Sequence, residues 1–300
     1  MIEIKNVSKS FRDVDALHQI SVEIKEGEIF GLVGTNGAGK STLLRLITGV
    51  LQADQGEVLV DGEPVYDNET GKQKICFLPD SAYFPVNATA KTMMEDYRVV
   101  YPEFLSDRCQ KMLEGLGLDP NRRIRGYSKG MKKQLSVILG ICAQTKYLLC
   151  DETFDGLDPV IRQTVKSIFA TEMLDRDFVP VIASHNLREL EDICDHVGLL
   201  HKGGILLSES LDDMKYSIHK VQMVLRKPED EEQLLAELDT AWKEKRGSIL
   251  TVIARGEEKE IMDKVQRKDP LFAESLPLSL EEIFVTETEV AGYDVRNIIE

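Results

Sequence analysis

The chain has 300 residues, 42% of them hydrophobic, and a formal net charge of -15. This length and apolar content allow a sizeable core and predict about two domains, one main domain and an appendage. Non-specific electrostatic binding to nucleic acid or to an anionic membrane requires a basic surface. The acidic balance therefore argues against both, and no nucleic-acid partner is expected.

The five cysteines are odd in number and scattered, without C-x-x-C spacing. They predict neither a disulfide framework nor a zinc site, and a reducing cytosol fits them. The first residues lack the basic and then apolar run of a signal peptide, and no apolar stretch approaches the roughly 18 residues that span a bilayer. We therefore expect the chain by itself to be soluble.

Residues 2–33 are predicted to form strands, because 2–4 and 20–24 alternate apolar and polar positions. Phe11 follows the first of these strands. An aromatic ring there could stack on adenine, but a Phe near a strand end is more often part of the core. From the residues alone, we expect Phe11 to lie in the core.

The stretch from Gly34 to Thr42 fits the phosphate-binding pattern G-x-x-x-x-G-K-[ST], between an apolar run and a helical one. Its glycines let successive backbone N–H groups point at phosphate oxygens, and the new helix presents its positive end to the same anion. Lys40 would reach the β- and γ-phosphates, and the Ser41 hydroxyl would ligate Mg²⁺. The predicted contacts are Gly34, Asn36, Gly37, Ala38, Gly39, Lys40, Ser41 and Thr42.

Short strands are predicted next at 55–62 and 74–78, the second stopping at Pro79 and Asp80. From 88 to 144 the pattern changes to helices, which indicates a helical subdomain. Methionines and aromatics in this region suit an adaptable contact surface as well as core packing. For any single one of them, the core is the expected place.

Ser128 is predicted to cap a helix over 129–143, whose apolar positions recur at spacings of three and four. The unbroken apolar run 147–150 then ends in Asp151 and Glu152, as in a buried parallel strand with carboxylates at its carboxyl end. The next expected elements are a helix at 159–174, a strand at 179–183 and a helix at 187–194. This alternation predicts a mostly parallel, doubly wound sheet.

A strand pair around the turn at 202–204 closes the main domain, and 211–216 is predicted to link onward. We place the domain boundary at 215, with a small α+β domain over 216–300. Its expected elements are a strand at 221–225, an acidic helix at 229–245, a strand at 248–254, a helix at 257–268, a short extended piece and the stretch 278–284. No cluster of ionisable groups in this tail predicts catalysis.

Four elements in one order go beyond a lone phosphate loop: the loop itself, 127–131, 148–152 and 156–159, followed by Ser184 and His185. Together they resemble the ATP-binding cassette of ABC transporters. The resemblance implies an α/β phosphate-loop NTPase fold, with a mostly parallel sheet, an antiparallel β part and a helical subdomain over about 88–144.

The resemblance covers residues 2–215. In the tail, the stretch 279–284 resembles part of the cassettes of ABC-2-type exporters.

The resemblance further implies ATP and Mg²⁺ as cofactors, with hydrolysis of ATP. Phosphoryl transfer to water depends on positioning and charge neutralisation, so a metal and a base must both serve the γ-phosphate. Asp151 would hold the metal through its shell, and Glu152 would be the general base. His185 would contact the γ-phosphate, although a lone His after a strand is more often a cap or a surface residue. Phe11 would stack on adenine.

The segment 127–131 stands where the family has L-S-G-G-Q, and it keeps Ser128 and Gly130. In the family this segment binds the γ-phosphate held by the opposite subunit, so a homodimer or heterodimer of cassettes is implied. Asp158 is likewise implied to contact the nucleotide. Asp80 stands in place of a metal-ligating glutamine. A carboxylate can still ligate Mg²⁺, but its added charge could weaken nucleotide binding or change the coupling.

The function implied is the ATP-hydrolysing subunit of an exporter, on separately encoded transmembrane permease subunits at the inner face of the cell membrane. Residues 93–104 would cup a short permease helix, with Met94 and Tyr97 on an exposed patch. The alternative is a soluble ABC ATPase acting on ribosomes or nucleic acid, which usually carries two cassettes or a coiled-coil insertion. A small-molecule kinase would leave 128–131 unexplained.

Overall fold

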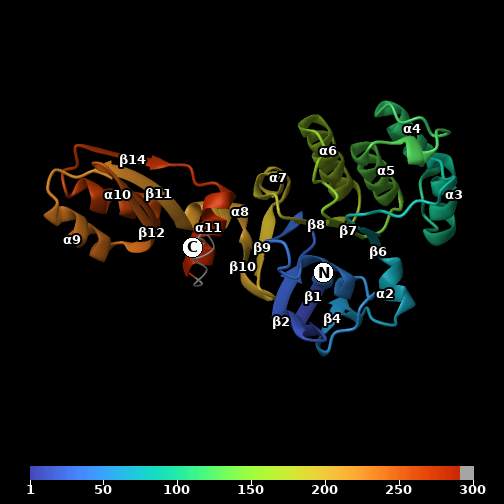
Figure 1. Cartoon of the computed structure of the whole chain (residues 1–300), viewed down its shortest axis with the longest axis horizontal. Coiled ribbons are helices and arrows are strands. Elements are labelled where there is room, and N and C mark those ends of the chain that lie inside the picture. The colour runs from blue at the N-terminus through green and yellow to red at the C-terminus, as the bar shows by residue number, and fades with distance from the viewer. Residues whose placement is uncertain (291–300) are drawn as a thin grey trace. The chain divides into compact units, whose positions relative to one another are not determined.

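The computed structural model describes residues 1–290 and divides the chain into two compact units, the first ending at Ser208 and the second beginning at Glu209. Figure 1 shows the elements of both. The expected linker at 211–216 is a helix, α8 (Leu211–Ser217), which Ser210 caps by accepting a hydrogen bond from the Asp213 N–H. This helix belongs to the second unit.

The first unit is built on a six-stranded sheet in the order β10-β9-β3-β8-β7-β6. β3 pairs in parallel with β8 and β9, and β7 pairs in parallel with β6 and β8, so the predicted mostly parallel sheet is confirmed. Residues of β3, β7 and β8 are buried throughout, which is why their sequences lack alternation. The strands are β3 (Phe30–Gly34), β6 (Ile75–Leu78), β7 (Tyr147–Asp151), β8 (Val179–Ser184), β9 (His196–His201) and β10 (Gly204–Ser210).

An antiparallel sheet in the order β2-β1-β4-β5 forms the second layer. Its strands are β1 (Ile2–Phe11), β2 (Val14–Ile24), β4 (Gln55–Val60) and β5 (Glu63–Pro64). Helix α1 (Lys40–Ile47) shares one hydrophobic core with both sheets: Ile4 of β1, Leu44 of α1 and Leu149 of β7 belong to the same buried cluster. The phosphate loop therefore leads into a helix that is fixed between two sheets.

The helices that follow confirm the predicted starts. Ser128 caps α5 by accepting a hydrogen bond from the Met131 N–H, and Asp158 caps α6 through the Ile161 N–H. Figure 1 shows α3, α4 and α5 grouped together as the helical subdomain. The bounds are α2 (Glu69–Gln73), α3 (Ala90–Val100), α4 (Ser106–Gly115), η1 (Ile124–Gly126), α5 (Lys129–Cys142), α6 (Pro159–Asp175) and α7 (Leu187–Ile193).

The interior of this subdomain includes Met94, which is only 9% exposed. The expectation that Met94 lies on an exposed patch is therefore wrong. The neighbouring Tyr97 ring packs against the rings of Tyr101 and Phe104, because this face of α3 turns toward the other helices. The exposed apolar side chains of α3 are instead Val99 and Val100, at 86% and 64%.

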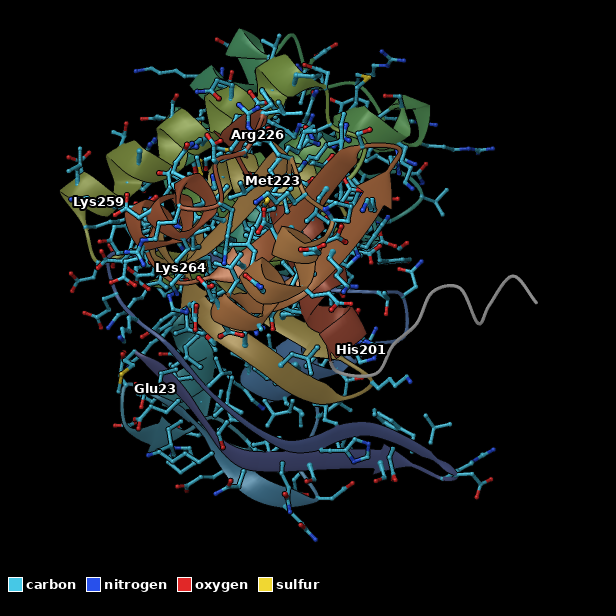
Figure 2. All side chains as sticks on the ribbon, turned by 90° about the vertical axis from the view of Figure 1, so that its left-hand side faces the viewer. Glu23, His201, Met223, Arg226, Lys259 and Lys264 are labelled. Carbon is cyan, nitrogen blue, oxygen red and sulfur yellow. The ribbon has the colours of Figure 1, made fainter. Side chains whose placement is uncertain are left out.

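The second unit is an antiparallel sheet in the order β12-β13-β11-β14, with α9 and α10 against one face. Its core includes Met223 of β11, Leu234 of α9 and Ile261 of α10. Figure 2 shows Met223 together with Lys259 and Lys264, two side chains of α10. The elements are β11 (Ile218–Val224), α9 (Glu229–Glu237), β12 (Asp239–Arg246), β13 (Ile249–Arg255), α10 (Glu258–Gln266), β14 (Phe272–Leu276) and α11 (Leu280–Val290).

The predicted acidic helix at 229–245 is wrong in its second half. The helix ends at Glu237, and 239–246 form β12, which pairs along β13. β12 is an edge strand whose residues are mostly polar on both faces, so it shows no apolar alternation. Its lysines and glutamates are also good helix formers, and the pairing with β13 overrides that preference.

Candidate functional site

The phosphate loop is shaped by glycines that no other residue could replace without strain. A Cβ atom at Gly34 would lie 2.5 Å from the Leu200 carbonyl oxygen. Gly39 has φ +108°, and a Cβ there would lie 2.7 Å from the Ala16 carbonyl oxygen. The loop therefore fits closely between β2 and β9 while its backbone curls ahead of α1.

Lys40, the first residue of α1, is held inside this loop. The residue is 4% exposed, and Nζ donates hydrogen bonds to the carbonyl oxygens of Gly34 at 2.8 Å and Thr35 at 3.2 Å. Nζ also lies 3.9 Å from Oε1 of Glu152. Burial lowers the pKa of this ammonium, while the carboxylate of Glu152 opposes that shift. The ammonium thus lies between the loop and the acidic end of β7.

Asp151, the last residue of β7, has the chemistry of a metal ligand. It is 3% exposed, and its Oδ1 atom is buried without a hydrogen-bond partner among residues 1–290. Burial raises the pKa of its carboxyl group, while a hydrogen bond with Ser41 favours the ionised form. A buried carboxylate oxygen beside a hydroxyl suits a hard cation with oxygen ligands, so Asp151 and Ser41 fit Mg²⁺.

Glu152, Asp155 and His185 meet beside Lys40, with ligand atoms within 4.8 Å of one another. Nδ1 of His185 is 3.1 Å from Oδ2 of Asp155 and 3.4 Å from Oε1 of Glu152. The Asp155 carboxylate also accepts a hydrogen bond from the Ser184 hydroxyl. With Nδ1 facing two carboxylates, the other ring nitrogen is left to meet a ligand.

Lys133 of α5 also reaches the end of β7. It is 6% exposed, and Nζ donates to the carbonyl oxygens of Glu152 and Asp155. The same atom lies 3.5 Å from Oδ1 of Asp80. Asp80, Lys133, Glu152 and His185 line one cavity of about 400 Å³.

Glu189 of α7 also lines this cavity and is buried. Its Oε1 forms an ion pair with Arg162 of α6 at 2.6 Å. Burial and the neighbouring carboxylate of Asp155 raise the pKa of Glu189 to about 7.

The other predicted site residues lie at the edges of this centre. Phe11 is 43% exposed, near the turn between β1 and β2, with Lys9 Nζ 5.6 Å from its ring centre. It pairs with Val14 of β2, the strand whose Ala16 touches the phosphate loop. Ser128 is an exposed helix cap, Gly130 lines the cavity, and the Asp158 carboxylate caps α6. Within the loop, Ala38 is buried and Asn36 is exposed.

Sequence reasoning missed Lys133 and Asp155. Asp155 lies between the two predicted stretches 148–152 and 156–159, and its sequence signal was a third acidic residue soon after Asp151 and Glu152. Lys133 showed no signal of its own, because its partners are far away in the sequence.

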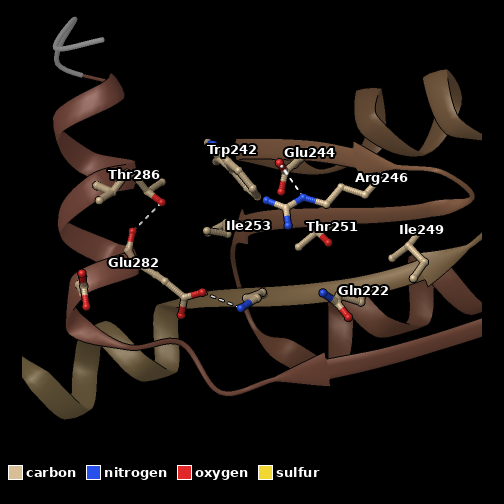
Figure 3. A pocket seen from close by; sticks show the side chains of 12 residues that line it. Gln222, Trp242, Glu244, Arg246, Ile249, Thr251, Ile253, Glu282 and Thr286 are labelled. Carbon is tan, nitrogen blue, oxygen red and sulfur yellow. Dashed lines mark hydrogen bonds and ion pairs between the residues drawn. The ribbon is translucent and has the colours of Figure 1, made fainter. Parts of the chain in front are cut away.

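A second hollow, of about 590 Å³, lies in the second unit between α11 and the sheet face that α9 and α10 leave open (Figure 3). Lys220 pairs with Glu282 there, and Arg246 pairs with Glu244. Each of these two cations therefore already has a carboxylate beside it, and the hollow shows no preference for an anion.

Residues 17–155 match the protein-family model described as ABC transporter. The chain is also 31% identical to the ABC transporter ATP-binding protein YtrB of Bacillus subtilis, over 96% of this chain and 98% of that protein. The chain belongs to the ABC transporter ATP-binding proteins. The family binds and hydrolyses ATP, so this cassette is an ATPase.

Two further matches extend this finding. The bacitracin transport ATP-binding protein BcrA of Bacillus licheniformis is 26% identical to the cassette, over 72% of this chain and 71% of that protein. The dimeric cassette MJ0796, in a post-hydrolysis state with ADP and Pi, matches with a TM-score of 0.63 and 21% identity, over 70% of this chain and 99% of that chain. The structural match confirms the predicted cassette fold.

Within residues 1–290, no helix combines the length and the apolar character needed to cross a membrane.

Proposed function

We propose that this cassette is the ATP-hydrolysing subunit of a membrane exporter and works by ATP-dependent closure of a cassette dimer. The observation that carries the hydrolytic part is the meeting of Lys40, Glu152 and His185 beside the buried Asp151. Relatives named for import and for export both align with about 70% of the chain. The exporter assignment therefore rests on the tail, with the stretch 279–284 as its support.

Each residue at the strand end has one role in this proposal. Lys40 neutralises the β- and γ-phosphates, and Glu152 takes a proton from the attacking water. His185 holds the γ-phosphate through the ring nitrogen that faces away from Asp155. Mg²⁺ would neutralise phosphate charge. Ser41 would ligate the ion, Asp151 would hold it through its coordination shell, and Asp80 is a further candidate ligand.

The remaining contacts concern the two ends of the nucleotide. Phe11 is 43% exposed at the end of β1, so its ring is accessible for stacking on adenine. Ser128 and Gly130 at the start of α5, with Asp158, would meet the nucleotide held by the opposite subunit. A dimer, of identical or of different cassettes, would then complete each site.

We propose a separately encoded permease as the second partner, with the cassette in the cytoplasm at the inner face of the membrane. Val99 and Val100 support a protein contact on α3, because large apolar side chains of this exposure gain by being covered.

The experiment is Glu152→Gln, which keeps the shape of the side chain and removes the base. Hydrolysis of ATP should fall by roughly 10²- to 10⁴-fold while MgATP still binds. Size-exclusion chromatography should then show a dimer with MgATP and a monomer without it. Normal hydrolysis would remove Glu152 from the mechanism, and a monomer despite bound ATP would contradict closure by the cassette alone.

A further inference from the structure

Lys133 joins three segments that are far apart in the sequence. From α5 its ammonium reaches the carbonyl oxygens of Glu152 and Asp155, in the turn after β7. It also reaches the carboxylate of Asp80, in the segment after β6. Two of the three N–H donors of the ammonium therefore have carbonyl acceptors, and the carboxylate of Asp80 lies beside its charge as an ion-pair partner.

The burial of Lys133 indicates that these contacts are needed to stabilise its charge. At 6% exposure, its ammonium has lost most of its water, and a buried charge is costly unless it is paired and hydrogen-bonded. Asp80 supplies the opposite charge and is itself 46% exposed. Asp80 alone would add negative charge beside Glu152 and Asp155, and Lys133 offsets that charge.

The turn that Lys133 holds has a backbone conformation that needs support. Glu152 has φ +48°, in the left-handed region that side chains other than glycine rarely adopt. Its N–H donates to the Ala183 carbonyl oxygen at 2.8 Å, and its own carbonyl oxygen accepts from Lys133. Strand β8 and helix α5 therefore fix the two sides of one residue, and this sets the direction of its carboxylate toward Lys40 and His185.

We propose that Lys133 is a positioning residue for hydrolysis, which fixes the Glu152 turn and connects it through Asp80 to the segment between β6 and α3. The inference rests on the proposed role of Glu152 as the base. Lys133 itself touches neither nucleotide nor water in this role. Its effect on the rate passes through the placement of the Glu152 carboxylate.

The test is Lys133→Met, which keeps a long side chain and good helix propensity but removes the donors. A misplaced base is expected to lower kcat by roughly 10- to 100-fold, with KM and the affinity for MgATP changed by less than about threefold. Lys132→Met on the same helix is the matched control and should leave kcat within about twofold. Lys133→Arg, which keeps donors and charge, should restore part of the rate.

A double variant separates positioning from a general structural effect. In the Glu152→Gln background the base is already absent, so adding Lys133→Met should leave the residual rate unchanged. A further fall by the same factor as in the wild-type background would overturn the inference, as would a normal kcat for Lys133→Met alone.

Asp80→Asn covers the case in which Lys133→Met does not fold, as judged by thermal unfolding. The Asp80 pair is partly exposed, so its loss should lower kcat by only about threefold, and that fall should also disappear in the Glu152→Gln background. An undiminished fall there at saturating Mg²⁺ would overturn the inference, because excess metal offsets any loss of metal affinity from Asp80 as a candidate ligand. If Glu152→Gln alone hydrolyses ATP normally, the proposed function fails instead, whatever Lys133 does.

Discussion

Replacing Lys40 with alanine should remove most of the affinity for MgATP while changing the nucleotide-free fold little. A unit charge about 4 Å from a phosphate charge, at an effective dielectric constant of about 20, contributes about 4 kcal/mol. Since about 1.4 kcal/mol corresponds to a factor of ten, the dissociation constant should rise by roughly 10³-fold. Glu152, 3.9 Å from the lysine, would then repel the phosphates without compensation.

The small effect on the fold follows from two opposing contributions. The lysine makes two hydrogen bonds to loop carbonyl oxygens, each stabilising by about 1.5–3 kcal/mol when the donor is charged. The residue is only 4% exposed, and burying an ion costs several kcal/mol. The free energy of unfolding without nucleotide should therefore change by no more than about 2 kcal/mol.

Isothermal titration with MgATP and urea unfolding of the same samples measure the two quantities. Lys111→Ala, on the exposed side of α4, is the matched control for loss of a lysine. An affinity of the Lys40 variant within about threefold of wild type would refute the phosphate role. A loss of stability far above 2 kcal/mol would show that the loop needs the ammonium even without nucleotide.

Two further predictions concern the subdomain surface and the cavity. Val99→Glu should keep the unfolding free energy within about 0.5 kcal/mol of wild type but reduce co-purification with detergent-solubilised membranes. Met94→Glu, in the core, should instead unfold the chain. Unchanged co-purification of Val99→Glu would place the permease contact elsewhere. Glu189 faces Asp155, Arg162 and His185, and its pKa is raised to about 7. Its protonated form therefore stabilises the fold at low pH, and this contribution is lost as the pH rises through 7. Urea unfolding from pH 5 to 8 should show a steeper loss of stability for wild type than for Glu189→Gln, and parallel curves would contradict the shift.

Short-range sequence patterns predicted the elements whose structure depends mainly on neighbouring residues. The glycines before Lys40, the cap at Ser128 and the apolar run of β7 each predicted their element, because loop geometry, capping and burial leave direct traces in the sequence. The edge strand β12 left no such trace, since its polar residues form a strand only by pairing with β13. Met94 was misplaced because an apolar residue on a helix looks the same in a core and on a contact surface.

In the site too, residues marked by a local pattern were predicted, whereas contacts between segments distant in the sequence were not. Asp151 and Glu152 were predicted because a carboxylate pair ends a buried strand. The partners of Lys133 could not be predicted, because its three acceptors come from segments that only the folded chain brings together.

Glu152 is held at both ends by lysines from different helices, and this links the two halves of the proposed mechanism. Lys40 at the start of α1 lies beside its carboxylate, and Lys133 of α5 holds its carbonyl oxygen. Helix α5 is capped by Ser128, the residue proposed to meet the nucleotide of the opposite subunit, little more than one turn before Lys133. A movement of α5 when the dimer closes would therefore act directly on the turn that carries the base. Binding at one site would then adjust the base of the other, because one helix serves both.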